Sequence, residues 1–532
     1  MNINFASLIY ITVLKFLKRE VLIMDLKIIR QPITINDAVY SNSGEIPIDE
    51  DFQLPDYFAE INKMLKCKCE GRITSKSVNG MSLVVDGHVC INLMYCDKEG
   101  NLYSYEHISP FSKTFDVSED LTGAIIEASL KNEYINCRVV TERKVSVHGA
   151  LTAYVKAILM KNYEVVADIE EDKIQIDRKE IPALNSIGNA EKNLLLEEEL
   201  TLSSGQPSIV NILRYSAFPT VTEVKTLKNK VSVKGNLAVT VLYRGEKQCA
   251  VYKSVVPFSQ LLEVNGVFDE CVCSAKVNLC YLEVKPIVSN NEQRTMQLSA
   301  KLNVCVKSFC DEKIPVISDL YSTDYEVNIT KRDINIERVL GHIGDNYMFK
   351  STLDFGDAQI NNIIDSWCDT EIINCAFNDG SLIVKATVNI CILAMDSADK
   401  ISFFEKKQEF TYKKSLDHTI SGKLNCDAVF EPISVSYTLL NDNSIEYRIE
   451  YRINVSLCEE KTYPMLYEIG YDEKNKIAKR QDCSMIIYFA NEGEKIWDIA
   501  KMYNSDINQV RQINTINGEK IDEDRQILIP II

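Results

Sequence analysis

The stretch from Val231 to Tyr243, with the sequence VSVKGNLAVTVLY, decides the fold class of this chain. Apolar residues alternate with polar or small residues along it, and four of the apolar residues are β-branched valines. Alternation with a period of two is typical of a β-strand that buries one face. Turn residues flank the stretch on both sides, so it is predicted to form hairpins with its neighbours.

The same order of features occurs three times along the chain. In each copy a turn precedes an alternating apolar run, and a small residue in that run marks the corresponding position. These markers are Gly87, Gly235 and Ala386, and the returning strands carry Phe111, Phe258 and Phe410. The markers repeat at intervals of roughly 150 residues, a length that can hold its own hydrophobic core.

A second alternating apolar set follows in each copy, around Gly149, Ala300 and Glu450. Each copy is therefore predicted to be a β-rich module that folds independently, with the three modules in tandem. A short amphipathic helix is expected to open each module, because apolar residues recur there at positions i, i+3 and i+4. The residues concerned are Ile61, Met64 and Leu65, then Ile209, Ile212 and Leu213, then Ile360, Ile363 and Ile364.

The segment after residue 483 has a different pattern. An apolar run at 485–489 predicts a strand, residues 496–503 predict a helix, and residues 527–530 predict a closing strand. A second helix is expected between them, with Asp506 as its N-cap and Ile507, Val510 and Ile513 facing inward. The segment is therefore predicted to be a small strand-helix-helix-strand domain.

These patterns together predict a mainly β fold, with three tandem β-rich modules of sandwich or barrel type and a small βααβ domain.

The apolar run at 5–14 is too short to span a bilayer and lacks the features of a signal peptide, so we expect translation to start at Met24. The predicted division is an extension at 1–24, modules at 25–180, 181–328 and 329–471, a linker at 472–483 and the last domain at 484–532.

Composition and charge exclude several classes of function. The chain has 59 basic and 76 acidic residues, and its net charge of −17 disfavours nucleic acid and anionic membrane surfaces as partners. Motifs for phosphate binding and for hydrolytic catalysis are absent from the sequence. Positions shared by the three copies are apolar or small, so we expect no enzymatic activity and no cofactor.

Cysteine and histidine usage indicates neither a metal site nor a disulfide scaffold. The chain has 17 cysteines without a C-x-x-C pair, and its five histidines do not lie at ligand spacing. Two C-x-C pairs, Cys67/Cys69 and Cys271/Cys273, leave a metal or redox role open. Buried thiols in a reducing compartment are the favoured interpretation.

The repeat order resembles tandem modules of the SPOCS or DUF3794 type, which occur in clostridial spore-coat proteins. The C-terminal segment resembles the LysM domain, on the motif Gly-x-x-Ile-Trp-Asp-Ile-Ala that begins at Gly493 and the closing Ile-Leu-Ile-Pro. Two loops depart from the LysM pattern. Gly493-Glu494-Lys495 stands where Gly-Asp-Thr or Gly-Asp-Ser is usual, and Asp524-Arg525-Gln526 stands where Pro-Gly-Gln is usual.

The combination of these domains resembles spore-coat morphogenesis proteins. It implies a non-enzymatic scaffold in the mother-cell cytoplasm, at the forespore surface. The implied partner is a morphogenetic ATPase of the stage IV sporulation protein A type, with other coat proteins as further candidates. The alternative is a cell-wall protein that binds peptidoglycan or N-acetylglucosamine chains, because the two loops line the glycan groove in LysM domains.

We expect the C-terminal domain to recognise a protein rather than a glycan, because the loops are charged and Lys495 replaces a hydroxyl residue. Trp497 lies beside these loops, and tryptophan is frequent at interface hot spots, although partial burial in the core would explain it equally well. The candidate partner-binding residues are Asn491, Gly493, Glu494, Lys495, Ile496, Trp497, Asn514, Thr515, Ile516 and Asn517.

Overall fold

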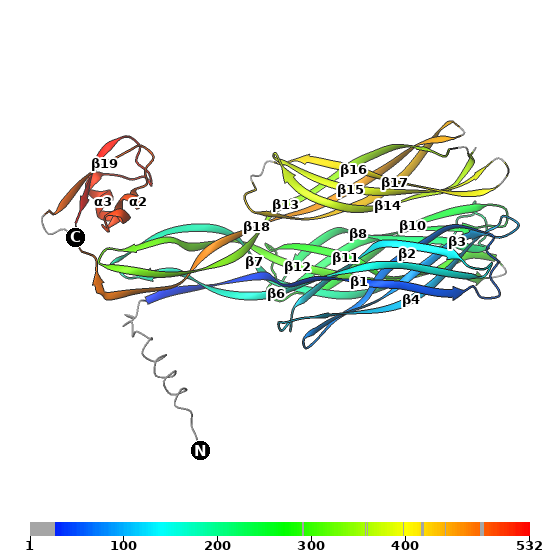
Figure 1. Ribbon diagram of the computed structural model, residues 1–532, viewed down its shortest axis with the longest axis horizontal. Helices are drawn as coiled ribbons and strands as arrows, with labels where there is room; N and C mark the ends of the chain where they lie inside the picture. Colours follow the sequence, from blue (N-terminus) through cyan, green and yellow to red (C-terminus); the bar gives the residue numbers. More distant parts are fainter. Residues whose placement is uncertain are drawn as a thin grey trace, which may run out of the picture.

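The computed structural model describes residues 27–289, 292–356, 358, 360–396, 398, 400–416, 420–441, 443–478 and 483–531. The predicted extension at 1–24 and the expected start at Met24 lie outside these residues. The chain is mainly β, as predicted: three modules of antiparallel strands are followed by a small domain with two short helices (Figure 1).

The first module is a β-sandwich. Its strands are β1 (Lys27–Gln53), β2 (Lys63–Asn79), β3 (Ser82–Cys96), β4 (Leu102–Asp116), β5 (Ile125–Val139) and β6 (Lys144–Glu170). They form two three-stranded antiparallel sheets, with the orders β1-β6-β5 and β2-β3-β4. The facing sides of the sheets bury one apolar cluster that includes Leu83, Ile91 and Val147.

Modules 2 and 3 repeat this topology strand for strand. Module 2 contains β7 (Ile174–Thr201), β8 (Asn211–Leu227), β9 (Lys230–Arg244), β10 (Cys249–Glu263), β11 (Val272–Ser289) and β12 (Glu292–Ser322). Module 3 contains β13 (Tyr325–Asp354), β14 (Ile360–Asn378), β15 (Ser381–Asp396), β16 (Ile401–Ser415), β17 (Lys423–Asn441) and β18 (Ser444–Lys476). The sheets are β11-β12-β7 with β10-β9-β8, and β13-β18-β17 with β14-β15-β16.

The prediction of a helix at the start of each module is wrong, because these segments lead into strands β2, β8 and β14. A β-bulge interrupts each strand at the i+4 residue, namely Leu65, Leu213 and Ile364. The preceding i+3 residue packs against the core of its own sandwich, whereas the bulged residue packs against the neighbouring modules. Burial of both faces of a bulged strand therefore produced a helix-like spacing in the sequence.

The three modules close into a ring. Leu65, Leu213 and Ile364 meet in one apolar cluster, the ring junction, which also contains Met94, Leu242 and Leu393. Around it, β4 of module 1 contacts β8 of module 2, β10 contacts β14, and β16 contacts β2. Each contact repeats the previous one a module further on, as in a cyclic trimer. One chain thus builds a pseudo-threefold assembly from three covalently joined copies.

Long two-stranded arms extend from the three sandwiches and pack together as a stalk. The first halves of β1, β7 and β13 pair with the second halves of β6, β12 and β18. These arms run side by side toward the left of Figure 1. Val165, Val316 and Met465 occupy equivalent positions in the shared apolar core, and Ile169, Leu320 and Ile469 do so nearer the end of the arms, the stalk tip.

The predicted divisions between modules fall inside strands of the stalk. The division at 180/181 lies within β7, that at 328/329 lies within β13, and the linker predicted at 472–483 begins inside β18. Short segments, 171–173 and 323–324, join the end of one arm to the start of the next. Because the junction and the stalk draw on all three modules, a single module leaves part of its apolar surface for its neighbours to cover.

The C-terminal domain has the predicted order of strand, helix, helix and strand: β19 (Met485–Ala490), α2 (Ile496–Met502), α3 (Ile507–Asn514) and β20 (Arg525–Pro530). Asp506 caps α3 as predicted, because its side chain accepts hydrogen bonds from the backbone N–H groups of Asn508 and Gln509. The expectation that Ile513 faces inward is wrong, since its side chain is 41% exposed. Asn514 takes the inward place, because its amide bonds the backbone of Val510 and Leu528.

The marker glycines impose a steric constraint on the sandwiches. A Cβ atom at Gly235 would lie 2.2 Å from the carbonyl oxygen of Thr220 and 2.3 Å from the ring of Phe258. Phe258 lies directly opposite Gly235 on the paired strand, as Phe111 lies opposite Gly87. The ring therefore occupies the space of the missing side chain.

We predict that Gly235→Ala lowers the free energy of unfolding by about 1–3 kcal/mol, because the added methyl group overpacks the site. Thermal denaturation followed by circular dichroism measures the effect. Gly205→Ala is the matched control, since a Cβ atom there meets nothing within 4 Å. Equal melting temperatures for the two variants would contradict the steric argument.

Candidate functional site

The structure brings the two predicted groups of site residues to neighbouring loops of the C-terminal domain. Backbone bonds from Gly493 to Ile521, from Ile521 to Glu494 and from Ile496 to Glu519 join the first loop to the segment 519–521. This segment follows closely on Asn514–Asn517, the second predicted group. Asn491, Gly493, Lys495, Thr515 and Asn517 are exposed, Glu494 is half-buried, and Ile496, Trp497, Asn514 and Ile516 are buried.

Glu494 has a structural role in the first loop. Its carboxylate accepts hydrogen bonds from the backbone N–H of Asn491 at 3.2 Å, from the Asn491 side chain at 3.2 Å and from the Tyr488 hydroxyl at 3.4 Å. Gly493 has a φ of 87°, which favours glycine over other residues. The loop is therefore closed on itself and held in a fixed shape.

Trp497 faces the stalk tip of the same chain. Its indole Nε1–H donates a hydrogen bond to Asp319 Oδ2 at 2.9 Å, and its side chain is only 9% exposed. Lys501 Nζ, one turn further along α2, donates to the two oxygens of Asp319 at 2.6 and 2.7 Å. Asp319 lies near the end of β12, so its carboxylate binds two side chains of α2 to module 2.

An aromatic contact completes this attachment. The Tyr321 ring lies 5.0 Å from the Trp497 ring, edge to face, and its hydroxyl donates to the backbone carbonyl of Ser505 at 2.6 Å. Tyr321 is buried in the same apolar cluster as the core of the C-terminal domain. The backbone N–H of Ile507 bonds Gln175 Oε1 of β7 at 3.4 Å. We call the set Gln175, Asp319 and Tyr321 the dock.

The dock belongs to one of three equivalent stalk ends. Strand register places Gln175 opposite Tyr321, Lys27 opposite Glu170, and Asn328 opposite Gly470. Module 1 thus has Asp168 and Glu170 where module 2 has Asp319 and Tyr321, and module 3 has Glu468 and Gly470. Asp168 forms an ion pair with Arg178 instead. The C-terminal domain sits at the end that offers both a carboxylate and an aromatic ring.

Sequence reasoning did not indicate the dock or a second surface. Met485, Ile487 and Phe489 alternate on the outer side of β19, and Leu528 lies opposite Ile487 on β20. All four side chains are exposed, Phe489 to 70% and Ile487 to 58%. The run at 485–489 is apolar on both faces of the strand, and this signal could have indicated a second covered surface.

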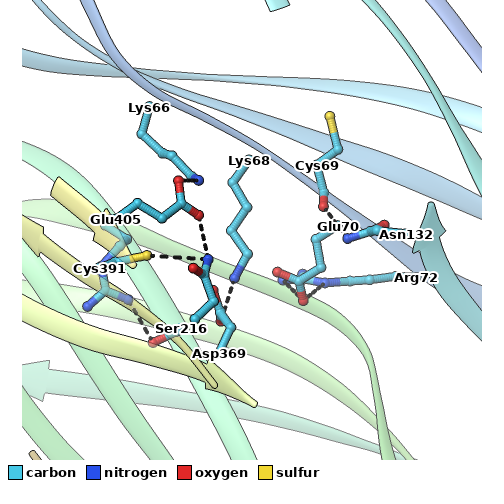
Figure 2. A network of polar contacts seen from close by, with 12 residues as sticks. Lys66, Lys68, Cys69, Glu70, Arg72, Asn132, Ser216, Asp369, Cys391 and Glu405 are labelled. Atoms are coloured by element: carbon cyan, nitrogen blue, oxygen red, sulfur yellow. Dashed lines mark hydrogen bonds and ion pairs between the residues drawn. The ribbon is translucent and has the colours of Figure 1, made fainter. Parts of the chain in front are cut away.

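A cavity of about 1420 Å³ lies where the three modules meet, and ion pairs between modules line it. Figure 2 shows Lys66 and Lys68 of β2 reaching Glu405 and Asp369 of module 3, at 2.5 and 2.9 Å. Burial opposes ionisation of Glu405, but hydrogen bonds from Lys66 and Asn389 outweigh it and keep the pKa of Glu405 below its usual range. These pairs fix the modules relative to one another.

A third ion pair between modules lines the same cavity. Arg214 of β8 bonds Asp365 of β14 at 2.9 Å, and both side chains are largely buried. The Arg214 guanidinium also lies 4.3 Å from the centre of the Trp367 ring, a cation–π contact. Removal of one partner would leave a buried charge unpaired, which is strongly destabilising.

The cysteines differ in part from the prediction. Cys375 of β14 and Cys426 of β17 form a disulfide that joins the two sheets of module 3, where reduced thiols were expected. The two residues are 51 positions apart, so spacing gave no signal of the pair. Cys69 and Cys271 of the C-x-C pairs are buried in apolar clusters, as predicted. Within the described residues, His, Cys, Asp and Glu side chains form no group that could hold a metal ion.

We predict that the attachment of α2 to the dock depends on pH. Burial raises the pKa of Asp319, but the hydrogen bonds from Lys501 and Trp497 outweigh it and hold the pKa below the ordinary value of about 3.9. A lowered pKa means that ionised Asp319 stabilises the docked form above pH 4 or so, and that this stabilisation is lost as the pH falls through the docked value.

Emission from Trp497 in a Trp367→Phe variant follows this transition, because Trp367 is the other tryptophan of the chain. We expect the emission to be constant from neutral pH down to about pH 4 and to shift below it. The Asp319→Asn variant should lack the shift. The same titration curve in both proteins would show that another group is responsible.

In the described part of the chain, neither helix has the length and hydrophobicity that a bilayer crossing requires.

Comparison with known families assigns the sandwiches of the first two modules. Residues 60–153 and 208–287 match the family model described as SipL, SPOCS domain. The matched segments run from β2 into β6 and from β8 into β11, and module 3 has the same strand order. No curated protein and no solved structure matches the chain. The first two modules therefore carry SPOCS domains of the SipL type, which links the chain to sporulation.

Proposed function

We propose that the chain is a non-enzymatic scaffold of spore-coat assembly. In this proposal it acts in the mother-cell cytoplasm at the forespore surface, and its C-terminal domain captures a morphogenetic ATPase of the stage IV sporulation protein A type. The family match to SPOCS domains supports a role in sporulation. One further observation carries the capture step, namely the apolar outer face of the C-terminal domain.

The outer face consists of Met485, Ile487, Phe489 and Leu528. The opposite side of the same two strands packs on α2 and α3, and the helices in turn contact the dock. The outer face therefore points away from the rest of the chain. Contiguous exposed apolar side chains of this size favour a protein partner, because such surfaces mark interaction sites on soluble domains.

The charges around the outer face indicate the chemistry of the partner. Glu492, Asp522, Glu523 and Asp524 are exposed near the Phe489 end, and the Glu492 backbone N–H bonds Asp524 at 2.7 Å. A partner with an apolar patch and basic residues at its rim complements this surface. The exposed loop residues Asn491, Gly493 and Lys495 follow β19 directly in the sequence. Two copies of this chain would set acidic rims against each other.

The ring and stalk support the scaffold part of the proposal. Ion pairs between the modules hold the ring together, and the ion pair at the dock joins the C-terminal domain to the stalk. Several binding surfaces on one rigid chain raise the effective concentration of each at an assembling layer, so that contacts of modest affinity give stable encasement.

We predict that Phe489→Ala weakens binding of the purified ATPase by about 2 kcal/mol, or roughly 30-fold in Kd, the scale of an interface hot spot. Isothermal titration calorimetry with the full chain measures the change. Met502→Ala is the matched control, because Met502 is also well exposed on the same domain but lies on α2, away from the outer face.

A second titration, against chitooligosaccharides and peptidoglycan fragments, tests the alternative function. Glycan binding in the micromolar range, together with unchanged ATPase binding by the Phe489→Ala variant, would favour a cell-wall protein over a scaffold.

A further inference from the structure

We propose that the Trp497–Lys501 face of α2 is a recognition site for an extended acidic-aromatic peptide segment of the form Asp-x-Tyr. In this structure the site holds the chain's own segment, Asp319 to Tyr321. A partner segment of the same chemistry would bind by taking its place and would release the C-terminal domain from the stalk.

The donors on α2 are matched to a carboxylate. Trp497 Nε1 and Lys501 Nζ lie one helical turn apart, and both donate to Asp319. Lys501 bonds both carboxylate oxygens, and Trp497 bonds one of them. Charge-assisted bonds from two donors on a rigid helix select an ionised carboxylate over a neutral amide.

The second half of the site is matched to a phenol. The Tyr321 ring packs edge to face on the Trp497 ring, and its hydroxyl reaches the carbonyl of Ser505, just beyond the end of α2. Residues i and i+2 of an extended chain point to the same side, so Asp319 and Tyr321 face the helix together. The site thus binds a carboxylate and a phenol that lie two residues apart on an extended strand.

The other two stalk ends show that this recognition is selective. The corresponding pairs are Asp168 with Glu170 and Glu468 with Gly470, neither of which provides an aromatic ring. At all three ends the first and last strands of a module pair in the same register, yet the C-terminal domain occupies the end with both groups.

The contacts that attach α2 to the stalk are weak enough for a partner segment to replace the Asp319–Tyr321 segment. The Asp319 and Lys501 side chains remain 30% and 41% exposed, so water screens the ion pair. Among the described residues, contact between the domain and the stalk includes this ion pair, the Trp497–Asp319 hydrogen bond, the burial of Tyr321 against Trp497 and two hydrogen bonds to backbone groups. A competing segment therefore has to replace only a few interactions.

The test uses the full chain with Trp367→Phe, so that fluorescence reports on Trp497. Asp319→Ala empties the carboxylate position, and Asp168→Ala is the matched control at the equivalent position of module 1. We expect Asp319→Ala to raise the population of the released domain about tenfold, because the charged hydrogen bonds are lost. Acrylamide should then quench the fluorescence of Trp497 more strongly than in the parent protein. The control should be quenched like the parent.

A synthetic peptide with the sequence of residues 316–323, VISDLYST, is then added at millimolar concentration. It should restore protection of Trp497 in the Asp319→Ala protein, whereas peptides with Asn in place of Asp or Ala in place of Tyr should not. Lys501→Gln in the same background should abolish the protection. None of these experiments requires the ATPase.

Two results would overturn the proposal. Equal quenching of the parent and the Asp319→Ala protein would mean that the carboxylate does not hold the domain in place. Failure of the VISDLYST peptide to protect Trp497 in the Asp319→Ala protein, or equal protection by the two altered peptides, would mean that the face does not recognise the Asp-x-Tyr segment.

Discussion

The ring depends on a single constraint, which is that the second strand of each module must bury both of its faces. A bulge at Leu65, Leu213 or Ile364 sends adjacent apolar side chains to opposite sides. The side chain on one side packs in the module's own sandwich. The side chain on the other side is buried only at the centre of the ring. Closure around this cluster then aligns the three two-stranded arms, which can pack as a stalk only when they lie side by side. The dock exists because that alignment brings all three arm ends to one tip.

Much of this fold could be predicted from the sequence, and the errors have a common origin. Alternating apolar runs and two-residue turns gave the hairpins and the threefold repeat, because strand periodicity is a local property. The error came where burial depends on distant parts of the chain. Leu65 beside Met64 has the spacing of a helix face, and only the neighbouring modules explain why both are buried. The same holds for Asn514, which takes the inward place expected for Ile513 because its amide satisfies the backbone of β20.

The sequence placed the loops of the candidate site close together, because they follow a recognisable motif in a short segment, and their role in binding stays a prediction. What the sequence could not supply was the direction in which Trp497 points. Its partner Asp319 lies 178 positions earlier, and a carboxylate near the end of a charged strand has no distinguishing local pattern. Equivalent positions in the other modules carry Asp168 and Glu468, so charge alone would not have singled it out. The pairing with Tyr321 does so, and it becomes visible only once strand register is known.

The covalent connection of the three copies has a consequence for stoichiometry and for the sequence of each copy. A ring built from three identical subunits would carry every substitution three times and would bear three C-terminal domains. Here a tyrosine occurs at one arm end and a glutamate or a glycine at the other two. Because the copies are joined in one chain, each can carry its own residues at equivalent positions while the geometry of the ring is kept. The result is an asymmetric particle with one C-terminal domain for every three modules, a ratio that is set during translation and does not vary with protein concentration.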